Sequence, residues 1–268
     1  MRTVKSPKGS FQVKKNKKLT FARKLADLFS HVRPIRIRVS AIVLAAGSSA
    51  RMGSTQTKQW IEIDGIPTVV RSLSVFQNCR HVKEIIVCAK QDEVSMYDGF
   101  KDKYGLTKLK CVIAGGSTRM LSAFEGFKRI SDKTTHVAVH DAARCLLTPA
   151  MLNDVIAEAV HLGAACAATK ATDTVKIEKR GHYVESSPER GKVWLAQTPQ
   201  IFETEIYRAS VYVALRDGIE VTDDCSMAEH AGFAVKLVDC GKENIKLTEP
   251  VDVYIAEAIL KKRSEKGN

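Results

Sequence analysis

Ala41-Ile-Val-Leu-Ala-Ala-Gly47 opens the stretch that decides the fold, and the chain continues as Ser48-Ser-Ala-Arg51-Met-Gly53. Its first five residues are apolar, which predicts a buried strand of a parallel sheet. The small residues that follow leave backbone N–H groups open to a phosphate chain. Arg51 and, further on, Lys58 add fixed positive charges of the kind that a triphosphate needs.

The pattern Gly-x-x-x-Arg-Met-Gly in this stretch matches neither the GxxxxGK[ST] phosphate loop nor the GxGxxG dinucleotide fingerprint. ATPase and NAD-dependent functions are therefore disfavoured. The segment resembles the signature of nucleotidyltransferases that load a sugar or polyol phosphate onto a nucleotide. A plain strand and small-residue turn would explain the glycines, but not two cations placed where phosphates would lie.

The positive charge of the chain is concentrated at its start. The 268 residues have a net charge of +12, yet residues 1–40 contain 12 Lys/Arg against one acid, and residues 41–268 contain 30 Lys/Arg against 29 Asp/Glu. The remaining composition, 44% hydrophobic and 27% charged, is that of a globular protein. We expect a basic extension, residues 1–39, and a nearly neutral domain, residues 40–263, that does not bind nucleic acid.

The seven cysteines are scattered and form no Cys-x-x-Cys pair, and several stand in apolar runs. Such thiols are typical of small core residues, so we expect a cytoplasmic protein in a reducing compartment. The sequence also leads us to expect neither a membrane-spanning helix nor a secretory signal, because no apolar run is long enough.

After residue 40, short apolar strands alternate with segments of helical spacing, which predicts a doubly wound, Rossmann-like, mostly parallel sheet of the α/β class. The expected strands are 41–46, 84–89, 109–114, 136–140, 164–169 and 234–239, and the expected helices are 67–79, one from about 92, 118–130, 149–162 and 250–260.

Residues 173–194 break this alternation. Thr174–Glu178 and Tyr183–Ser186 flank Lys179-Arg-Gly-His182, a pattern typical of a two-stranded ribbon with a glycine turn. The ribbon has little apolar surface of its own, so it needs support from elsewhere. We expect it to be a dimerisation arm that protrudes to a partner subunit in a homodimer.

The fourth expected strand ends in His140-Asp-Ala-Ala-Arg144. Ligands of open parallel sheets bind beyond the carboxyl ends of the strands, so Asp141 and Arg144 should face the same crevice as Arg51 and Lys58. A carboxylate beside phosphates is a natural ligand for Mg²⁺. The alternative is that Asp141 caps a helix, but the phosphate loop upstream favours metal binding. We expect His140 to be structural.

Four further polar clusters interrupt the apolar pattern. Gly115-Gly-Ser-Thr-Arg-Met-Leu-Ser122 permits close approach of a base, although a strand-to-helix turn would need the same glycines. The others are Thr198-Pro-Gln200, Thr222-Asp-Asp224 and Asn244-Ile-Lys-Leu-Thr248. Each alone could be a turn or a helix cap, and Thr222 before two aspartates is close to an ordinary helix start.

Taken in order, these motifs resemble those of the 2-C-methyl-D-erythritol 4-phosphate cytidylyltransferases, a family of the non-mevalonate isoprenoid pathway. The resemblance runs from about residue 40 to 261 and rests on Leu44-Ala-Ala-Gly, Arg51-Met, Lys58-Gln, Gly115-Gly, His140-Asp-Ala-Ala-Arg, Asp173-Thr, Gln197-Thr-Pro-Gln, Thr222-Asp-Asp and Asn244-Ile-Lys. Each motif is weak by itself, but together and in family order they are specific.

The resemblance implies a role for each matching position. Ala45, Ala46, Gly47, Gly116, Ser122 and Ala142 would line the CTP site, and Asp141 would bind Mg²⁺. Arg144, Thr174, Arg190, Thr198 and Thr222 would surround the polyol phosphate. Arg51, Lys58 and Lys246 would be the catalytic cations, acting on an in-line attack by the substrate phosphate at the α-phosphorus of CTP.

Three positions depart from the family pattern: Cys145 replaces a proline, Thr57 replaces the proline before Lys-Gln, and Ser117 replaces a common acidic residue. The nearest alternative is a ribitol-5-phosphate cytidylyltransferase, whose relatives tend to carry His-Asp-Ala-Val-Arg. An alternative of another class is a non-catalytic nucleotide-binding or scaffold protein, which should have lost Asp141 or Lys58.

The extension combines a basic run, Lys14–Lys24, with apolar residues at helical spacing, among them Leu25 and Phe29. A basic amphipathic helix can contact an anionic membrane surface weakly. The alternative is a solvated basic tail. In either case we expect the extension to be dispensable for chemistry.

Overall fold

The computed structural model describes residues 36–47 and 57–266. The chain divides into two units, residues 1–36 and 37–268, of which the second contains all the elements below. Arg51 and the helical pattern expected within residues 14–32 lie outside the described residues.

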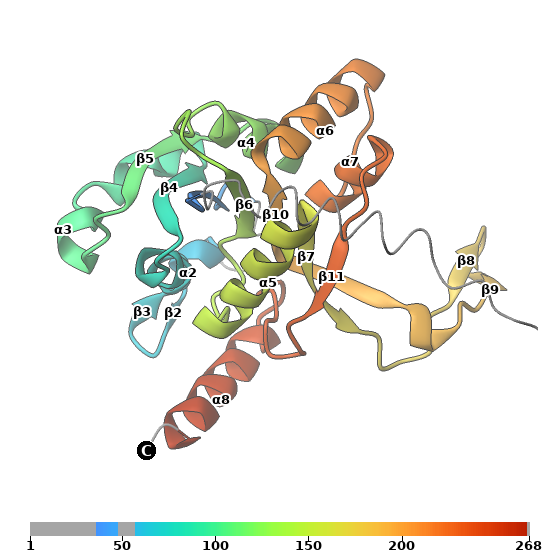
Figure 1. Ribbon diagram of the computed structural model, residues 1–268. Coiled ribbons are helices and arrows are strands. Elements are labelled where there is room, and N and C mark those ends of the chain that lie inside the picture. Colours follow the sequence, from blue (N-terminus) through green and yellow to red (C-terminus); the bar gives the residue numbers. More distant parts are fainter. Residues whose placement is uncertain (1–35, 48–56, 267–268) are drawn as a thin grey trace, which may run out of the picture. The chain divides into compact units, whose positions relative to one another are not determined.

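A seven-stranded sheet forms the centre of the second unit (Figure 1). Its spatial order is β11-β7-β10-β6-β1-β4-β5, and within this sheet the only antiparallel pairings among the described strands are those of β10 with its two neighbours. The strands are β1 (Val39–Leu44), β4 (Val82–Ala89), β5 (Leu109–Ala114), β6 (His136–Asp141), β7 (Ala164–Lys170), β10 (Trp194–Glu203) and β11 (Lys236–Asp239). The predicted α/β fold with a mostly parallel sheet is confirmed.

Alternate residues of each strand point to opposite sides of the sheet, and both sides are apolar. Both faces are therefore covered by helices. Ala41 and Val43 of β1 belong to the core under α2 (Thr68–Asn78) and α5 (Pro149–Leu162). Ile42 belongs to the core on the other face, which holds α4 (Arg119–Phe127), α6 (Thr204–Asp217) and α7 (Asp224–His230).

Gly126 brings α4 unusually close to the sheet. A Cβ atom at this position would lie 2.5 Å from Ile42 Cγ2 and 2.9 Å from Cys88 Sγ, so only glycine allows the helix to rest on β1 and β4 at this distance. This contact fixes the position of the loop before α4, which contributes to the candidate site.

The smaller elements connect or flank the sheet. They are η2 (Lys58–Trp60), β2 (Glu62–Ile63), β3 (Ile66–Pro67), η3 (Gln91–Tyr97), α3 (Phe100–Tyr104), β8 (Ile177–Lys179), β9 (Tyr183–Ser186), η4 (Arg190–Lys192) and α8 (Val251–Lys266). The helix expected from about Asp92 is thus a 3₁₀ segment followed by a short α-helix. Ala256 of α8 packs with Ile63 and Leu146 in a third apolar cluster.

The expected ribbon is present as the antiparallel pair β8–β9, which stands away from the large sheet (Figure 1). Gly181 and His182 have positive φ angles of 85° and 64°, as the turn between the strands requires. All residues of both strands are exposed. Trp194, placed at the end of the ribbon from sequence, begins β10 instead.

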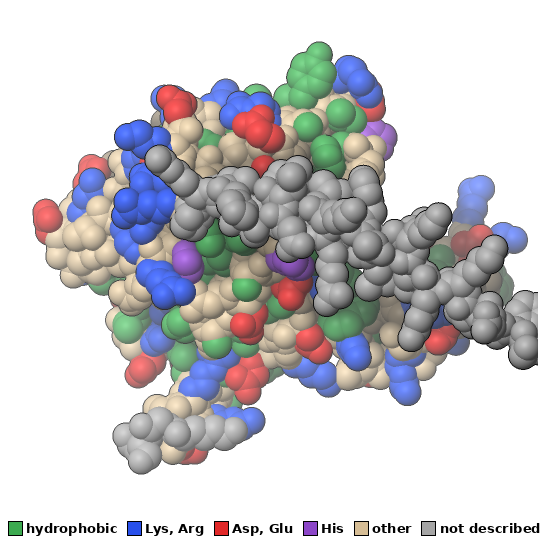
Figure 2. Space-filling model, in the orientation of Figure 1, with side chains coloured by type: hydrophobic (Ala, Val, Ile, Leu, Met, Phe, Trp, Pro, Cys, Tyr) green, Lys and Arg blue, Asp and Glu red, His purple; other side chains and the backbone are tan. Residues whose placement is uncertain are grey.

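The charged residues, the cysteines and the helices are arranged as the composition of the chain leads us to expect. Figure 2 shows Lys/Arg and Asp/Glu side chains interspersed over the face that it presents. All seven cysteines are free thiols, and six of them are buried. Among the described helices, none combines the length and hydropathy needed to cross a membrane.

Candidate active site

The carboxyl ends of β1 and β6 lie side by side, with Leu44 in register with Asp141. A cavity of about 450 Å³ opens beyond them. Its walls come from five parts of the chain, namely the end of β1, the end of β6, the segment at Lys58, the loop before α4 with the first turn of that helix, and the loop before α8. The lining residues are Leu44, Ala46, Gly47, Lys58, Gln59, Gly116, Ser117, Thr118, Arg119, Ser122, Asp141, Ala143 and Lys246.

Asp141 is the centre of a charge cluster. It is only 6% exposed. Lys246 Nζ lies 2.7 Å from its Oδ2, Arg119 Nε lies 3.3 Å from its Oδ1, and Arg144 Nε lies 4.0 Å from Oδ2. Burial would by itself raise the pKa of Asp141, but the charges of Arg119 and Lys246 outweigh it and hold the pKa well below its usual range. The group is therefore a carboxylate at neutral pH.

Arg119 and Asp224 belong to this cluster, although they were not predicted as site residues. Arg119 Nη1 lies 2.6 Å from Asp224 Oδ2, so its guanidinium joins the end of β6 to the start of α7. Asp224 is 1% exposed and also accepts a hydrogen bond of 2.9 Å from Tyr207 Oη. In the sequence, Arg119 is indistinguishable from a first-turn helix residue and Asp224 from a helix start, because their pairing spans 105 residues.

A second cavity of about 210 Å³ shares Arg119, Asp141 and Lys246 with the first. Its other lining residues include the predicted substrate ligands Arg144, Thr198 and Thr222. A hydrogen bond of 2.8 Å from Arg144 Nη1 to the carbonyl of Asn244 holds the Arg144 side chain in place. A helix does start at the polar cluster of residues 222–224, but its cap is Asp223 rather than Thr222, because the Asp223 side chain accepts from the backbone of Ser226. The two cavities therefore meet at Asp141.

The hydroxyl of Thr198 positions the backbone of Asp141. It accepts the N–H of Asp141 at 3.0 Å, and it lies 3.0 Å from Nδ1 of His140. The Thr198 hydroxyl can therefore donate its own proton to Nδ1 of His140. The other ring nitrogen of His140, Nε2, lies 3.3 Å from the carbonyl of Arg144. A neutral imidazole with its proton on Nε2 satisfies this network, and burial lowers the pKa of His140 to about 4, which favours that neutral form. His140 is thus hydrogen-bonded at both nitrogens.

The segment that carries Lys58 is tied to the loop after β1. The Gln59 amide donates to the carbonyls of Ala45 and Gly47, which fixes the turn where Lys58 enters the cavity. Thr57, one of the departures from the family pattern, donates its hydroxyl to Glu93 Oε1 at 2.9 Å. Thr57 thus holds the segment through a side-chain hydrogen bond that proline could not make.

The double glycine is required by packing within the loop itself. A Cβ at Gly115 would lie 2.7 Å from Ser122 Oγ, and one at Gly116 would lie 2.5 Å from Leu121 Cβ. Ser122 is buried, and its hydroxyl donates to the carbonyl of Thr118 at 2.8 Å. Gly116 and Ser122, both predicted nucleotide ligands, line the first cavity.

The remaining predicted site residues lie outside both cavity walls or outside the described residues. Ala45 and Ala142 are fully buried and line neither cavity. Thr174 and Arg190 are exposed in the region of the ribbon, and Arg190 Nη1 lies 3.5 Å from the carbonyl of Thr172. Arg51 is outside the described residues. Cys145, the second departure, packs with Ile63 in the apolar cluster under α8, and Ser117 is exposed at the cavity rim.

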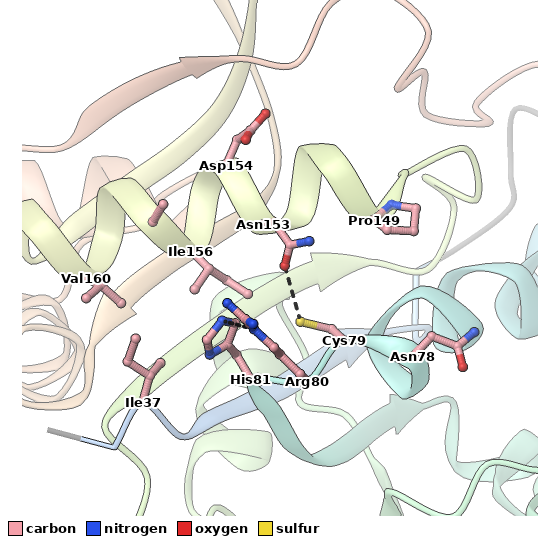
Figure 3. A pocket seen from close by; sticks show the side chains of 11 residues that line it. Ile37, Asn78, Cys79, Arg80, His81, Pro149, Asn153, Asp154, Ile156 and Val160 are labelled. Carbon is pink, nitrogen blue, oxygen red and sulfur yellow. Dashed lines mark hydrogen bonds between the residues drawn. The ribbon is translucent and has the colours of Figure 1, made fainter. Parts of the chain in front are cut away.

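Another cavity, of about 700 Å³, lies at the opposite end of the strands, where β1 and β4 begin (Figure 3). It is lined by residues such as Ile37, Arg80 and Asn153, and Figure 3 shows the Asn153 amide directed at the Cys79 thiol, 3.8 Å away. None of the predicted site residues lines it. Its volume alone therefore does not make it the candidate site.

Comparison with known proteins gives a consistent result. Residues 39–262 match the family described as IspD, 2-C-methyl-D-erythritol 4-phosphate cytidylyltransferase. The protein of that name from Syntrophus aciditrophicus is 38% identical over 226 residues, which cover 84% of this chain and 97% of that protein. The one from Geotalea uraniireducens is 36% identical, with 84% and 97% covered.

A solved structure has the same fold. The crystal structure of 4-diphosphocytidyl-2C-methyl-D-erythritol synthase from Anaerococcus prevotii superposes with a TM-score of 0.75 at 30% identity, covering 84% of this chain and 99% of that one. The sequence matches extend from β1 into α8 and include every loop that builds the two cavities. The chain belongs to the family of 2-C-methyl-D-erythritol 4-phosphate cytidylyltransferases.

Proposed function

We propose that this chain transfers the cytidylyl group of CTP to 2-C-methyl-D-erythritol 4-phosphate, giving 4-diphosphocytidyl-2-C-methyl-D-erythritol and pyrophosphate in isoprenoid precursor biosynthesis. Family membership over residues 39–262 supports this chemistry. The observation that carries the proposal is the cluster at Asp141, where Lys246 and Arg119 bond its two oxygens at the meeting point of two cavities. CTP in the first cavity and the acceptor phosphate in the second would meet there.

The phosphate oxygen of the acceptor attacks the α-phosphorus of CTP in line and expels pyrophosphate. No general base is needed, because the attacking phosphate is already an anion. The protein then contributes positioning and the neutralisation of charge that builds on the α-phosphoryl group. Lys58 and Lys246 line the first cavity and are assigned this role, and Arg51 is assigned the β- and γ-phosphates.

Asp141 is the proposed ligand of Mg²⁺. Its donor chemistry fits, because Mg²⁺ in nucleotide sites is commonly held by one or two carboxylates, with phosphate oxygens and water completing the shell. Within the described residues, no group of three or more His, Cys, Asp or Glu could enclose an ion. Bound Mg²⁺ would neutralise phosphate charge. Lys246, now 2.7 Å from Asp141, could then turn its ammonium to a phosphate oxygen.

The proposed assembly is a homodimer in which the ribbon completes the partner's site. Its support is the apolar surface on and beside the ribbon: Tyr183 is 75% exposed, Val184 60%, Leu195 52% and Ile177 44%. Exposed apolar side chains that gather in one region favour burial against a partner. Thr174 and Arg190 lie in the same region, so a two-fold arrangement would bring them to the second cavity of the other subunit.

The basic extension is assigned no part in the chemistry. We propose that the enzyme is cytoplasmic, which suits seven free thiols. Any contact of the extension with a membrane surface would be weak and electrostatic.

The test is pyrophosphate release by the full chain with CTP, Mg²⁺ and one of two acceptors. We expect turnover with 2-C-methyl-D-erythritol 4-phosphate and much less with ribitol 5-phosphate. A preference for ribitol 5-phosphate would reassign the acceptor, and no release with either would refute the transferase function. Omission of Mg²⁺ should abolish turnover with the preferred acceptor.

A further inference from the structure

Arg119 occupies the boundary between the two cavities. It is the first residue of α4, after the Gly115-Gly116 loop, and it lines both cavities together with Asp141 and Lys246. Its guanidinium uses Nε for Asp141 at 3.3 Å and Nη1 for Asp224 at 2.6 Å. The orientation of the planar group is therefore fixed by two carboxylates from different elements.

Asp224 holds the guanidinium from the side remote from Asp141. One of its oxygens accepts from Tyr207 Oη at 2.9 Å, and its backbone N–H donates to Gln200 Oε1 at 2.9 Å. Since Asp224 is 1% exposed, its carboxylate needs a paired cation, and Arg119 provides it. Asp141, by contrast, has Lys246 and Arg144 nearby as well.

The third nitrogen of the guanidinium, Nη2, is buried and has no hydrogen-bond partner among the described residues. A buried donor without a partner costs about 1–3 kcal/mol, so such groups are rare unless they serve a ligand. The other two nitrogens are engaged with protein, and the group lines the junction of both cavities. A phosphoryl oxygen at this junction is the chemically matching acceptor.

We propose that Arg119 contacts the substrate, with Nη2 donating to an oxygen of the α-phosphoryl group of the nucleotide, and that Asp224 is the positioning residue for its guanidinium. The inference rests on the proposed function and adds a third cation to Lys58 and Lys246. It differs from them in geometry, because Lys246 approaches Asp141 as a flexible point charge and Arg119 as a fixed planar donor.

The experiment compares five variants in the full chain: Arg119→Lys, Arg119→Ala, Arg119→Gln, Asp224→Asn, and the double variant that combines Arg119→Gln with Asp224→Asn. Arg71→Lys is the matched control, since Arg71 is also largely buried and donates to the carbonyl of Ile63 but lines neither cavity. The double variant removes both buried charges together, so it should fold even if Arg119→Gln alone does not. Circular dichroism and Tm establish folding for each.

For Arg119→Lys we expect kcat to fall about 100-fold, the typical effect of losing one transition-state donor, with little change in the KM for CTP. Asp224→Asn should lower kcat less, and added guanidinium should partly restore Arg119→Ala. If Arg119 has only a structural role, its variants should have a lower Tm, but kcat should not fall selectively while the KM for CTP stays unchanged. Wild-type kcat in a folded Arg119→Lys or double variant would overturn the proposal.

A second readout does not depend on turnover. The ³¹P resonance of the α-phosphate of bound CTP should differ between the wild type and the double variant, and should stay unchanged in Arg71→Lys. An unaltered α-phosphate resonance in the double variant would overturn the contact. If the wild type is inactive with both acceptors, the transferase function fails, and this resonance still decides whether Arg119 contacts the nucleotide.

Discussion

Asp141 and Lys58 show how single side chains set the chemistry of the site. Asp141 is a buried carboxylate bonded by two cations, whereas Lys58 is half-buried at the wall of the first cavity. We expect Asp141→Asn and Lys58→Ala each to reduce pyrophosphate release about 100-fold, because Lys58→Ala removes a cation at the reacting phosphates and Asp141→Asn removes the anionic ligand proposed for Mg²⁺. Lys110→Ala is the control, since Lys110 pairs with Glu84 and lines neither cavity. Near wild-type release from either folded variant would contradict these assignments.

His140 makes the stability of the protein depend on pH. The unfolded chain takes up a proton at this residue near pH 6.5, but the folded protein does so only near pH 4. The contribution of the neutral imidazole is therefore complete above about pH 6.5 and is lost as the pH falls towards 4, by up to about 3 kcal/mol. We expect His140→Asn to be less stable than the wild type at pH 7.5, and to lose less stability over this range. Denaturant unfolding at several pH values measures the free energy of unfolding of both proteins. If this free energy changes with pH in the same way in both, His140 is not the cause of the pH dependence.

At the scale of elements, the exposed ribbon β8–β9 leads to a test of subunit exchange. If Arg190 acts in the partner's site, a heterodimer of Arg190→Ala and Lys58→Ala subunits has one site with both residues intact and one site lacking both. We expect activity to recover partly on mixing the two variants, measured as pyrophosphate release after exchange. Arg180→Ala, at the tip of the same ribbon, is the control and should be active without mixing. No recovery despite demonstrated exchange would assign Arg190 to its own chain.

The elements also differ in how well sequence predicts them. The central parallel strands are buried on both faces, so they appear as continuous apolar runs such as Ala41–Ala46. Strand β10 was missed because Gln197, Thr198 and Gln200 are polar although buried, and their hydrogen bonds are made with distant segments. Arg119 and Asp224 were missed for the same reason. Motif order could locate the loops of the site, but not the ion pair that joins two of them.

At the scale of the whole molecule, the excess positive charge lies almost entirely in the first 40 residues of the chain. Residues 1–40 have 11 more Lys/Arg than Asp/Glu, while residues 41–268 have one more. The fold is anchored from Arg38 onward, whose N–H donates to Thr135 Oγ1 at 2.9 Å, and Val39 donates to the carbonyl of His81 at 2.9 Å. Both cavities at Asp141 are lined by residues 44–246.

A chain that begins at Pro34 should therefore keep the CTP turnover of the full chain, because it retains every described contact that holds the sheet and the site. It should bind anionic vesicles less well in a sedimentation assay, since most of the excess positive charge is removed. The control is the same assay with neutral vesicles, to which both chains should bind equally weakly. A large loss of turnover in the folded shorter chain would show that the extension takes part in the chemistry. Equal binding of both chains to anionic vesicles would remove the membrane role of residues 1–33 and leave the extension as a solvated basic tail.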